Sequence, residues 1–470
     1  MAPAGQTGAG TDRKRRRNKN KMKKQVLCVS LAVSLAAAMG AYGAVPVAET
    51  ELSYKGNLSI CLYTASEDAE DYGGCDTANA VIEEWNEIHP DITIEKNIFT
   101  EDEYDQQITA LAEENALPDI FLFSGVNTSD WAEKGLILDL TDYIRKSPYN
   151  NDYEGTYFIP FRADGKAYGY PALTCSTGTV VIYDKALWQE AGFESFPGTW
   201  KEVLTAAEYF NRQGIDTIAF GNADLQQAER SFFSVLGDRY TGSDWFRSLV
   251  ENNGAAFTDS SFIKALDELQ YLFTEEKIFN DDFNVVTNEQ AREFYITGNA
   301  AAYIGSSSDE VYIWEALKEA DPEKFENMGF ASLPQPIDAS KSPTSQNMTL
   351  AYAFAVNPAI SEDPDKLEAA VDLVQEATGP AFSSLAAENY ALSGLTAPGD
   401  ADISSFDRIT QDFFKWSYIE TEKCPTYDTY IDSNIWLTLA EDLKTLLSGE
   451  LAPEEAAYDV QAVYKPDTLQ

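Results

Sequence analysis

The sequence predicts an α/β protein of two successive units, each with a mostly parallel β-sheet covered by helices. Three observations predict this class. Strand and helix patterns alternate from residue 57 onward, which is typical of parallel sheets. The chain has 470 residues, enough for two or three domains of about 150 residues. Hydrophobic residues make up 44% of the chain and aromatic residues 12%, which is typical of globular proteins.

The first unit reads as strand, helix, strand, helix, strand. Short apolar runs mark the strands, and apolar residues at helical spacing mark the helices between them. This order predicts a parallel sheet with helices on its faces. The predicted strands are 57–63, 92–99 and 119–124, and the predicted helices are 76–88 and the segment around Tyr104, Ile108 and Leu111.

The second unit begins with the apolar strand 179–183 and a helix over 184–191 that ends at Gly192. Thr199 and Glu202 form a capping-box pattern that opens the next helix, which Gly214 closes. A strand is predicted at 216–220, and strands at 300–305 and 349–356 are expected to cross between the units. The segment 332–349 is rich in Pro and Ser and is interpreted as a loop. Later helices are predicted after Asp363-Pro364 and, as a pair, within 435–463.

The N-terminal segment 1–48 has the pattern of an export signal. Residues 13–24 contain nine Lys and Arg, and residues 25–48 carry no charge. Small residues around Tyr42 favour cleavage, although 24 uncharged residues are also long enough to remain as an anchor across a bilayer of about 30 Å. Cys28 follows Leu27 early in the apolar run, so a lipoprotein anchor is not evident. We expect the protein to be exported, either extracellular or associated with the cell surface at the outer face of the cytoplasmic membrane.

The exported part is strongly acidic. Beyond residue 44 it keeps 25 of the 34 basic and 76 of the 77 acidic residues, a net charge of −51. Such a surface repels nucleic acid and anionic membranes, so these are excluded as partners. Neutral or cationic solutes remain compatible with it.

The sequence predicts no catalytic, cofactor or metal site. His89 is the only histidine and precedes Pro90, which argues against a Ser-His-Asp triad. The chain has no HExxH, P-loop or G-x-S-x-G motif. Acidic residues are abundant, so a hydrolase using two carboxylates is not excluded by composition. The cysteines of the exported part match no zinc pattern, and disulfides and buried thiols both remain open for Cys61, Cys75, Cys175 and Cys424.

Several blocks of the chain resemble the bacterial extracellular solute-binding proteins of ABC importers, family 1, which include maltose-binding-protein-like sugar binders. The blocks are PDIFLFSG (118–125), EKGLILDLTDYI (133–144), the stretch 165–210 with GKAYGYPA and TGTVVIYDKALW, EFYITGNAAAYIGS (293–306), 350–374 and 446–461. They occur in order over nearly the whole exported part.

The resemblance implies a two-lobed periplasmic-binding-protein-like fold of type II with a ligand cleft between the lobes. The expected boundaries are 54–176 plus 350–400 for lobe 1 and 177–349 plus 401–470 for lobe 2. It also implies a monomer that captures a carbohydrate, expected to be an oligosaccharide, and delivers it to membrane permease subunits without chemistry. A different polar or cationic solute and an exported glycoside hydrolase are the alternatives.

A sugar presents apolar C–H faces and a rim of hydroxyls, which aromatic rings and polar side chains bind. In lobe 1 the resemblance places cleft residues after the first strand, at the end of the third strand, where open α/β sheets bind ligands, and at the crossover. Trp131 has core packing as its alternative, and Glu67 a solvated acidic loop. The lobe 1 and crossover candidates are Ser66, Glu67, Ser124, Gly125, Trp131, Tyr170 and Thr177.

In lobe 2 the segment NADLQQAERSFF resembles the family's cleft segment. Many sugar-binding relatives carry a Trp shortly after the IG at 304–305, whereas this chain has serines and an acid there. This departure weakens a strict oligosaccharide interpretation. Trp436 stands where related sugar binders have a stacking aromatic. The lobe 2 and hinge candidates are Gln226, Gln227, Arg230, Ser307, Asp309, Asn347 and Trp436.

Overall fold

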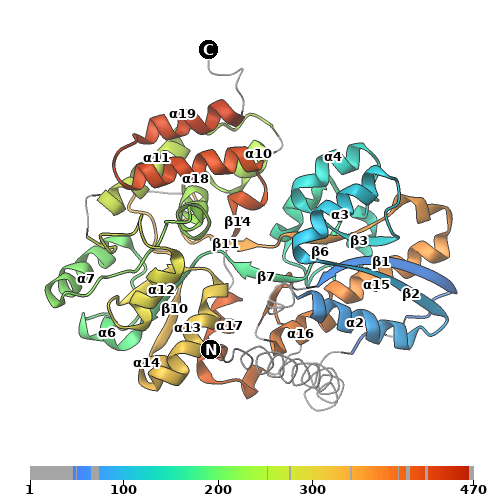
Figure 1. Cartoon of the computed structure of the whole chain (residues 1–470), viewed down its shortest axis with the longest axis horizontal. Helices are drawn as coiled ribbons and strands as arrows, with labels where there is room; N and C mark the ends of the chain where they lie inside the picture. Colours follow the sequence, from blue (N-terminus) through green and yellow to red (C-terminus); the bar gives the residue numbers. More distant parts are fainter. Residues whose placement is uncertain are drawn as a thin grey trace, which may run out of the picture.

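The computed structural model shows two lobes side by side, joined by strands that cross between them (Figure 1). It describes residues 46–464 except 49, 65–73, 251, 275–276, 339–340, 390, 399–402 and 419–421. Residues 1–45 of the predicted export segment lie outside the described residues. No helix in the described part of the chain has the length and apolar character to cross a membrane.

Lobe 1 is built on a five-stranded sheet with the order β2-β1-β3-β12-β6. β1 pairs in parallel with β2 and β3, whereas β12 pairs antiparallel with β3 and β6. The predicted strand–helix alternation of the first unit is confirmed. The elements are β1 (Gly56–Thr64), α2 (Cys75–Ile88), β2 (Ile92–Thr100), α3 (Glu101–Glu113), β3 (Ile120–Ser124), β6 (Tyr170–Ala172) and β12 (Tyr352–Val356).

Helices cover the lobe 1 sheet and are tied to one another. The indole of Trp85 on α2 is fully buried and donates a hydrogen bond of 2.8 Å to Asp372 on α15. The Pro at the first position of α15 and the Asp363 side chain cap its start, as the sequence predicts. The further helices of this lobe are α4 (Thr128–Glu133), α5 (Thr141–Lys146), η2 (Gly155–Phe161), α15 (Pro364–Thr378) and α16 (Pro380–Glu388).

Lobe 2 contains a three-stranded sheet with the order β10-β8-β9, from β8 (Val180–Asp184), β9 (Ala302–Gly305) and β10 (Met328–Ala331). Both pairings are antiparallel, and parallel contacts come from isolated bridges, so the expectation of a mostly parallel sheet is wrong for lobe 2. The predicted strand at 216–220 is reduced to such bridges at Asp216, Ile218 and Ala219. The expectation that 300–305 crosses between the units is wrong, because β9 pairs with β8 inside lobe 2.

Lobe 2 is largely helical around this sheet. Thr199 accepts from the Glu202 backbone N–H and donates to its carboxylate, and Gly214 at φ 73 ends α7, as predicted. The predicted C-terminal pair is also present as α18 and α19. The helices are α6 (Lys185–Glu190), α7 (Trp200–Gln213), α10 (Ser243–Val250), α11 (Ser260–Thr274), α12 (Asn288–Ile296), α13 (Ser307–Ala320), α14 (Pro322–Glu326), α18 (Ser433–Leu447) and α19 (Pro453–Tyr464).

Four strands form a small sheet between the lobes with the order β13-β7-β11-β14, which we call the hinge sheet. β11 falls inside the predicted loop 332–349, so that prediction is wrong at its end. QNMT has no apolar alternation, but it gains hydrogen bonds on both sides, antiparallel to β7 and parallel to β14. The strands are β7 (Thr174–Thr177), β11 (Gln346–Thr349), β13 (Leu392–Ser393) and β14 (Lys423–Pro425).

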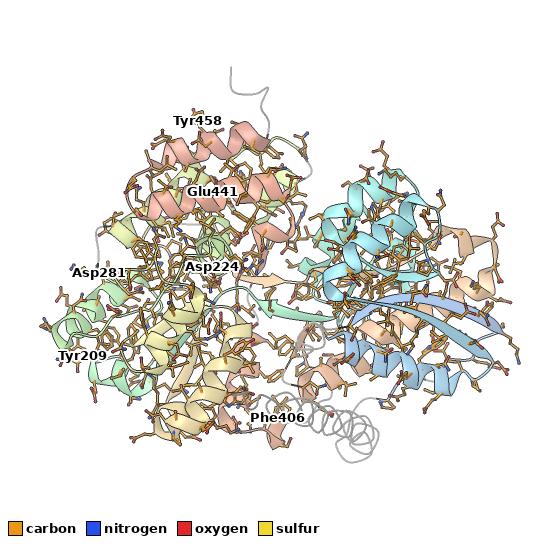
Figure 2. All side chains as sticks on the ribbon, in the orientation of Figure 1. Tyr209, Asp224, Asp281, Phe406, Glu441 and Tyr458 are labelled. Atoms are coloured by element: carbon orange, nitrogen blue, oxygen red, sulfur yellow. The ribbon has the colours of Figure 1, made fainter. Side chains whose placement is uncertain are left out.

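Each lobe has its own buried core, and Figure 2 shows the side chains gathered in two bodies. The first core draws on residues from Val47 to Cys175 and from Met348 to Leu395. The other two clusters lie almost entirely between Val180 and Val460 outside that range. Helix α17 (Arg408–Ser417) packs between the lobes, because Phe413 belongs to the first core and contacts Phe330 of β10.

The four cysteines of the exported part are buried, and none forms a disulfide within the described residues. Burial raises the pKa of the Cys61 thiol to about 11 and that of Cys175 to about 12, so neither thiolate forms near neutral pH. Among the described residues there is no group of three potential metal ligands.

Candidate functional site

The lobe 2 side of the site is one helical run of three parts, α8 (Gln226–Ala228), η3 (Glu229–Phe233) and α9 (Ser234–Thr241). Its middle part is a π-helix, a distortion that occurs frequently at functional sites. The neighbours Glu229 and Arg230 in this turn differ in exposure. Glu229 is fully buried, whereas Arg230 reaches toward solvent.

Arg230 forms an ion pair with Asp428 of η6 (Tyr427–Thr429). Its Nε lies 2.8 Å from Asp428 Oδ2, and one terminal nitrogen binds the same oxygen. The Arg230 side chain is 40% exposed and that of Asp428 is 11% exposed. The pair therefore holds a guanidinium in a fixed position with part of its surface open to a solute.

Trp436, in the first turn of α18, is half-buried and is linked to this helical run through Glu229. Its indole N–H donates a 3.0 Å hydrogen bond to Glu229 Oε2, and the Ser234 hydroxyl donates to Oε1. Burial, together with the nearby charge of Asp428, raises the pKa of Glu229 to about 8. Helix α8 contacts α18. In Figure 2 the two helices can be located by the labels of Asp224, which precedes α8, and Glu441, which lies on α18.

The hinge sheet is bonded directly to this lobe 2 cluster. Asn347 of β11 donates from its amide nitrogen to the Arg230 carbonyl at 2.9 Å and to the Thr426 hydroxyl at 3.2 Å. The Thr177 backbone N–H donates to the Ser307 hydroxyl at 3.0 Å. A Cβ on Gly178 would lie 2.4 Å from the Asn347 amide nitrogen, so only glycine fits this contact.

On lobe 1, Ser124 ends β3 and pairs with Tyr352, the first residue of β12. Gly125 follows with its Cα against Pro160, where a Cβ would meet the proline at 2.4 Å. The Tyr352 hydroxyl donates to Asp105 Oδ1 at 3.1 Å, and its ring packs near Tyr63 at 5.6 Å between centroids. A half-buried tyrosine bonded to a carboxylate therefore stands at the carboxyl edge of the lobe 1 sheet.

Sequence reasoning missed Tyr352, Asp105, Asp428 and Glu229. Tyr352 could have been identified from the sequence, because it lies within the predicted strand 349–356, next to the end of the strand that carries Ser124. The pairings Tyr352–Asp105 and Glu229–Trp436 join residues 247 and 207 positions apart, and no local pattern reports such contacts.

The candidates therefore separate into two groups. The structure brings Thr177, Arg230, Ser307, Asn347 and Trp436 together around the hinge sheet, with Gln226 exposed at the start of the same helical run. Ser124 and Gly125 lie at the edge of the lobe 1 sheet. Ser66 and Glu67 lie outside the described residues.

Thr177, Ser307 and Asn347 are themselves buried and hydrogen-bonded within the protein. The other four predicted residues are also committed to internal contacts in this structure. Trp131 is 4% exposed and stacks on Phe123, and buried Tyr170 accepts a hydrogen bond of 2.8 Å from Gln375. Gln227 accepts from the Ser231 hydroxyl. Asp309 pairs with Arg292 at 3.0 Å and caps α13.

A pocket of about 990 Å³ also lies between the lobes, and none of the predicted residues lines it. Thr241 at its wall is eleven residues along the helical run from Arg230, about 16 Å at 1.5 Å per residue. Several polar groups that line the pocket bind one another: Asp244 pairs with Arg247, and Lys341 donates to the Thr241 carbonyl. The pocket is lined by residues 154, 156, 159, 241–245, 247–248, 253–255, 341–342 and 422–423.

Two α/β lobes joined by crossing strands, with polar and aromatic side chains around the hinge, are the architecture of a two-lobed solute-binding protein. The model of the family described as "Bacterial extracellular solute-binding protein" matches residues 76–381. The chain therefore belongs to this family, and the fold class predicted from the sequence is confirmed.

Solved structures share the whole architecture. A probable secreted solute-binding lipoprotein from Streptomyces coelicolor aligns with a TM-score of 0.70 at 15% identity, over 88% of this chain and 99% of that one. A family 1 extracellular solute-binding protein from Bifidobacterium longum subsp. infantis aligns with a TM-score of 0.69 at 17% identity, over 88% and 99%. At these identities the likeness establishes the fold.

Curated relatives match over shorter stretches. A diacetylchitobiose binding protein of Streptomyces coelicolor is 31% identical over 121 residues, 26% of this chain and 24% of that protein. A polygalacturonan/rhamnogalacturonan-binding protein of Bacillus subtilis is 27% identical over 249 residues, 50% of this chain and 48% of that protein. These matches span less than half the length of the relatives.

Proposed function

We propose that the protein is the solute-binding component of an ABC importer and captures a carbohydrate, most simply an oligosaccharide, between its lobes. The observation that carries the proposal is the half-buried Trp436, which is bonded to Glu229, the chain neighbour of Arg230 in the Arg230–Asp428 pair. An aromatic ring next to fixed charged hydrogen-bonding groups suits a sugar. The names of the sugar-binding relatives support the same ligand class.

The proposed mechanism is capture without covalent chemistry. Trp436 covers an apolar face of the sugar, while Arg230 and Asp428 bind hydroxyls. The Tyr352–Asp105 pair contributes from lobe 1. Rotation of the lobes about the hinge strands then excludes water from these hydrogen bonds and marks the occupied state for the permease.

We further propose that lobe 1 comprises 54–176 plus 350–400 and lobe 2 comprises 177–349 plus 401–470. The two separate cores support this division, although Phe413 of α17 packs into the first core. The proposal includes export through the segment 1–48 and action as a monomer outside the cytoplasm.

Two alternatives to a neutral sugar ligand are decided by the experiment described below. The net charge of −51 beyond residue 44 favours a cationic solute, such as a polyamine, over an anionic one. Abundant carboxylates are compatible with a glycoside hydrolase.

The test incubates residues 46–470 with neutral oligosaccharides and with polyamines, separates protein from free solute, and identifies the bound molecule by chromatography. The proposal expects an oligosaccharide to be retained and released intact. Retention of a polyamine alone would favour the cationic alternative, and recovery of shortened sugars would show hydrolysis. Trp436→Ala serves as the control that should retain less sugar.

A further inference from the structure

We propose that Glu229 is a positioning residue that fixes the ring of Trp436 for the solute without contacting the solute itself. The inference rests on the proposed function, because it assigns Trp436 as the aromatic surface on which a sugar stacks. Glu229 is fully buried and therefore offers no surface to a solute.

The two carboxyl oxygens of Glu229 bind two different elements. Oε2 accepts from the Trp436 indole N–H on α18 at 3.0 Å, and Oε1 accepts from the Ser234 hydroxyl on α9. Ser234 in turn accepts from the Tyr427 backbone N–H of η6 at 2.9 Å. Glu229 thus links α18 and α9 directly and η6 through Ser234.

The same network holds the charged part of the site. Tyr427 precedes Asp428, which binds Arg230, and Arg230 follows Glu229 in the π-helical turn. A change at Glu229 is therefore expected to move the indole most and the Arg230–Asp428 pair less, because that pair has direct bonds of its own.

The protonation of the Glu229 carboxyl group depends on its burial and on the charges beside it. The ionisable groups that face it are Asp428 and Tyr427 of η6 and Arg230 of its own turn, and burial with the charge of Asp428 raises its pKa to about 8. Burial therefore favours the neutral acid at a pH where an exposed glutamate is ionised. Above pH 8 a carboxylate accepts the indole N–H more strongly, since hydrogen bonds to charged groups are stronger.

The first test needs no sugar. Tryptophan emission of residues 46–470 is measured from pH 6 to pH 10 in the unchanged protein, in Trp436→Phe and in Glu229→Gln. All buried core residues among those described lie at Val47 or later, so this chain keeps both cores. We expect a change within this pH range that both variants lack. An unchanged protein without this transition, or a transition that persists in Glu229→Gln, would overturn the inference.

The second test measures affinity at pH 7 for malto-, xylo- and chito-oligosaccharides and follows the tightest binder. Glu229→Gln keeps an acceptor for the indole and should stay within about threefold of the unchanged protein, while Glu229→Leu should bind at least tenfold more weakly. Glu376→Gln removes a buried carboxylate in lobe 1 and should leave affinity unchanged. If Glu229→Leu does not fold, Ser234→Ala replaces it and should weaken binding severalfold.

The outcomes separate the two proposals. Weak binding by Trp436→Ala together with unchanged binding by Glu229→Leu, or by Ser234→Ala in its place, would overturn the positioning role and leave the proposed function standing. Unchanged binding by Trp436→Ala would overturn both. Failure of every oligosaccharide to bind would contradict the proposed function, while the emission profile would still decide whether Glu229 controls Trp436.

Discussion

At the scale of single residues, the site depends on few side chains held by buried partners. Arg230 has its guanidinium fixed by Asp428, and Trp436 has its indole fixed by Glu229. Such fixed groups lose little conformational entropy when a solute binds. We therefore expect most of the binding free energy to come from these two positions.

Trp436→Ala is predicted to weaken sugar binding by ten- to a hundredfold, about 1.4–2.7 kcal/mol. The matched control is Trp245→Ala, which removes an indole from the 990 Å³ pocket at the other end of α9 and should leave affinity unchanged. Calorimetric titration of both variants, after a melting curve for each, checks the prediction. The reverse pattern would place the ligand in that pocket.

The sequence predicted part of this site because motif order locates the hinge and the start of α18. It could not tell which way a side chain points. Tyr170 and Trp131 have the same composition signal as Trp436, but their rings face the core. The partners Glu229 and Asp428 were missed because their roles arise from contacts across about 200 residues of chain.

At the scale of secondary-structure elements, the strands of the hinge sheet are the ones that the local sequence pattern predicts least well. β11 is polar and β13 and β14 have only two and three residues. They form strands because each finds a partner in the folded molecule. The helices and buried strands of lobe 1 were predicted well, since burial imposes periodicity on them. In lobe 2 the predicted strand at 216–220 forms only isolated bridges.

Gly178→Ala should disturb this hinge, because its Cβ would lie 2.4 Å from the Asn347 amide nitrogen and 3.2 Å from the Arg230 carbonyl. We predict a loss of about 1–3 kcal/mol in unfolding free energy and weaker sugar binding. Gly198→Ala is the control, since nothing lies within 4 Å of its added Cβ. Urea unfolding of both variants checks the difference, and equal stability would contradict the contact.

Helices α18 and α19 bring carboxylates together at Asp442. Burial and the charges of Asp459, Glu441 and Glu455 raise the pKa of Asp442 to about 7. Asp442→Asn is therefore predicted to raise the melting temperature at pH 8 and to have little effect below pH 5. The exposed neighbour Glu441→Gln should change stability by less than about 0.5 kcal/mol at either pH. A larger gain for Glu441→Gln would refute this account.

At the scale of the whole molecule, the high negative charge and the burial of carboxyl groups both favour protonated carboxyl groups in the folded state. The protein beyond residue 44 has a net charge of −51. Burial, first among the causes, raises the pKa of Asp238 to about 6, of Asp442 to about 7 and of Glu229 to about 8. The folded state therefore holds protons that the unfolded state has released.

The melting temperature is accordingly predicted to fall as pH rises from about 5 to 9. A carboxyl group with a raised pKa in the folded state contributes its full stability below its unfolded pKa of about 4 and loses it as pH rises through the folded value. Scanning calorimetry at constant ionic strength checks the slope, and Glu229→Gln combined with Asp442→Asn should flatten it between pH 6 and 9. A melting temperature that rises across this range would be inconsistent with these pKa shifts.

Isothermal titration calorimetry of residues 46–470 with neutral oligosaccharides tests the central claim most directly. The account predicts one saturable site with a Kd in the micromolar range or tighter, about −8 kcal/mol, and no heat after saturation. Continuous heat release after saturation would reveal turnover of the sugar. That result, or the absence of binding by every oligosaccharide, would contradict a protein whose work is to hold a sugar between two lobes.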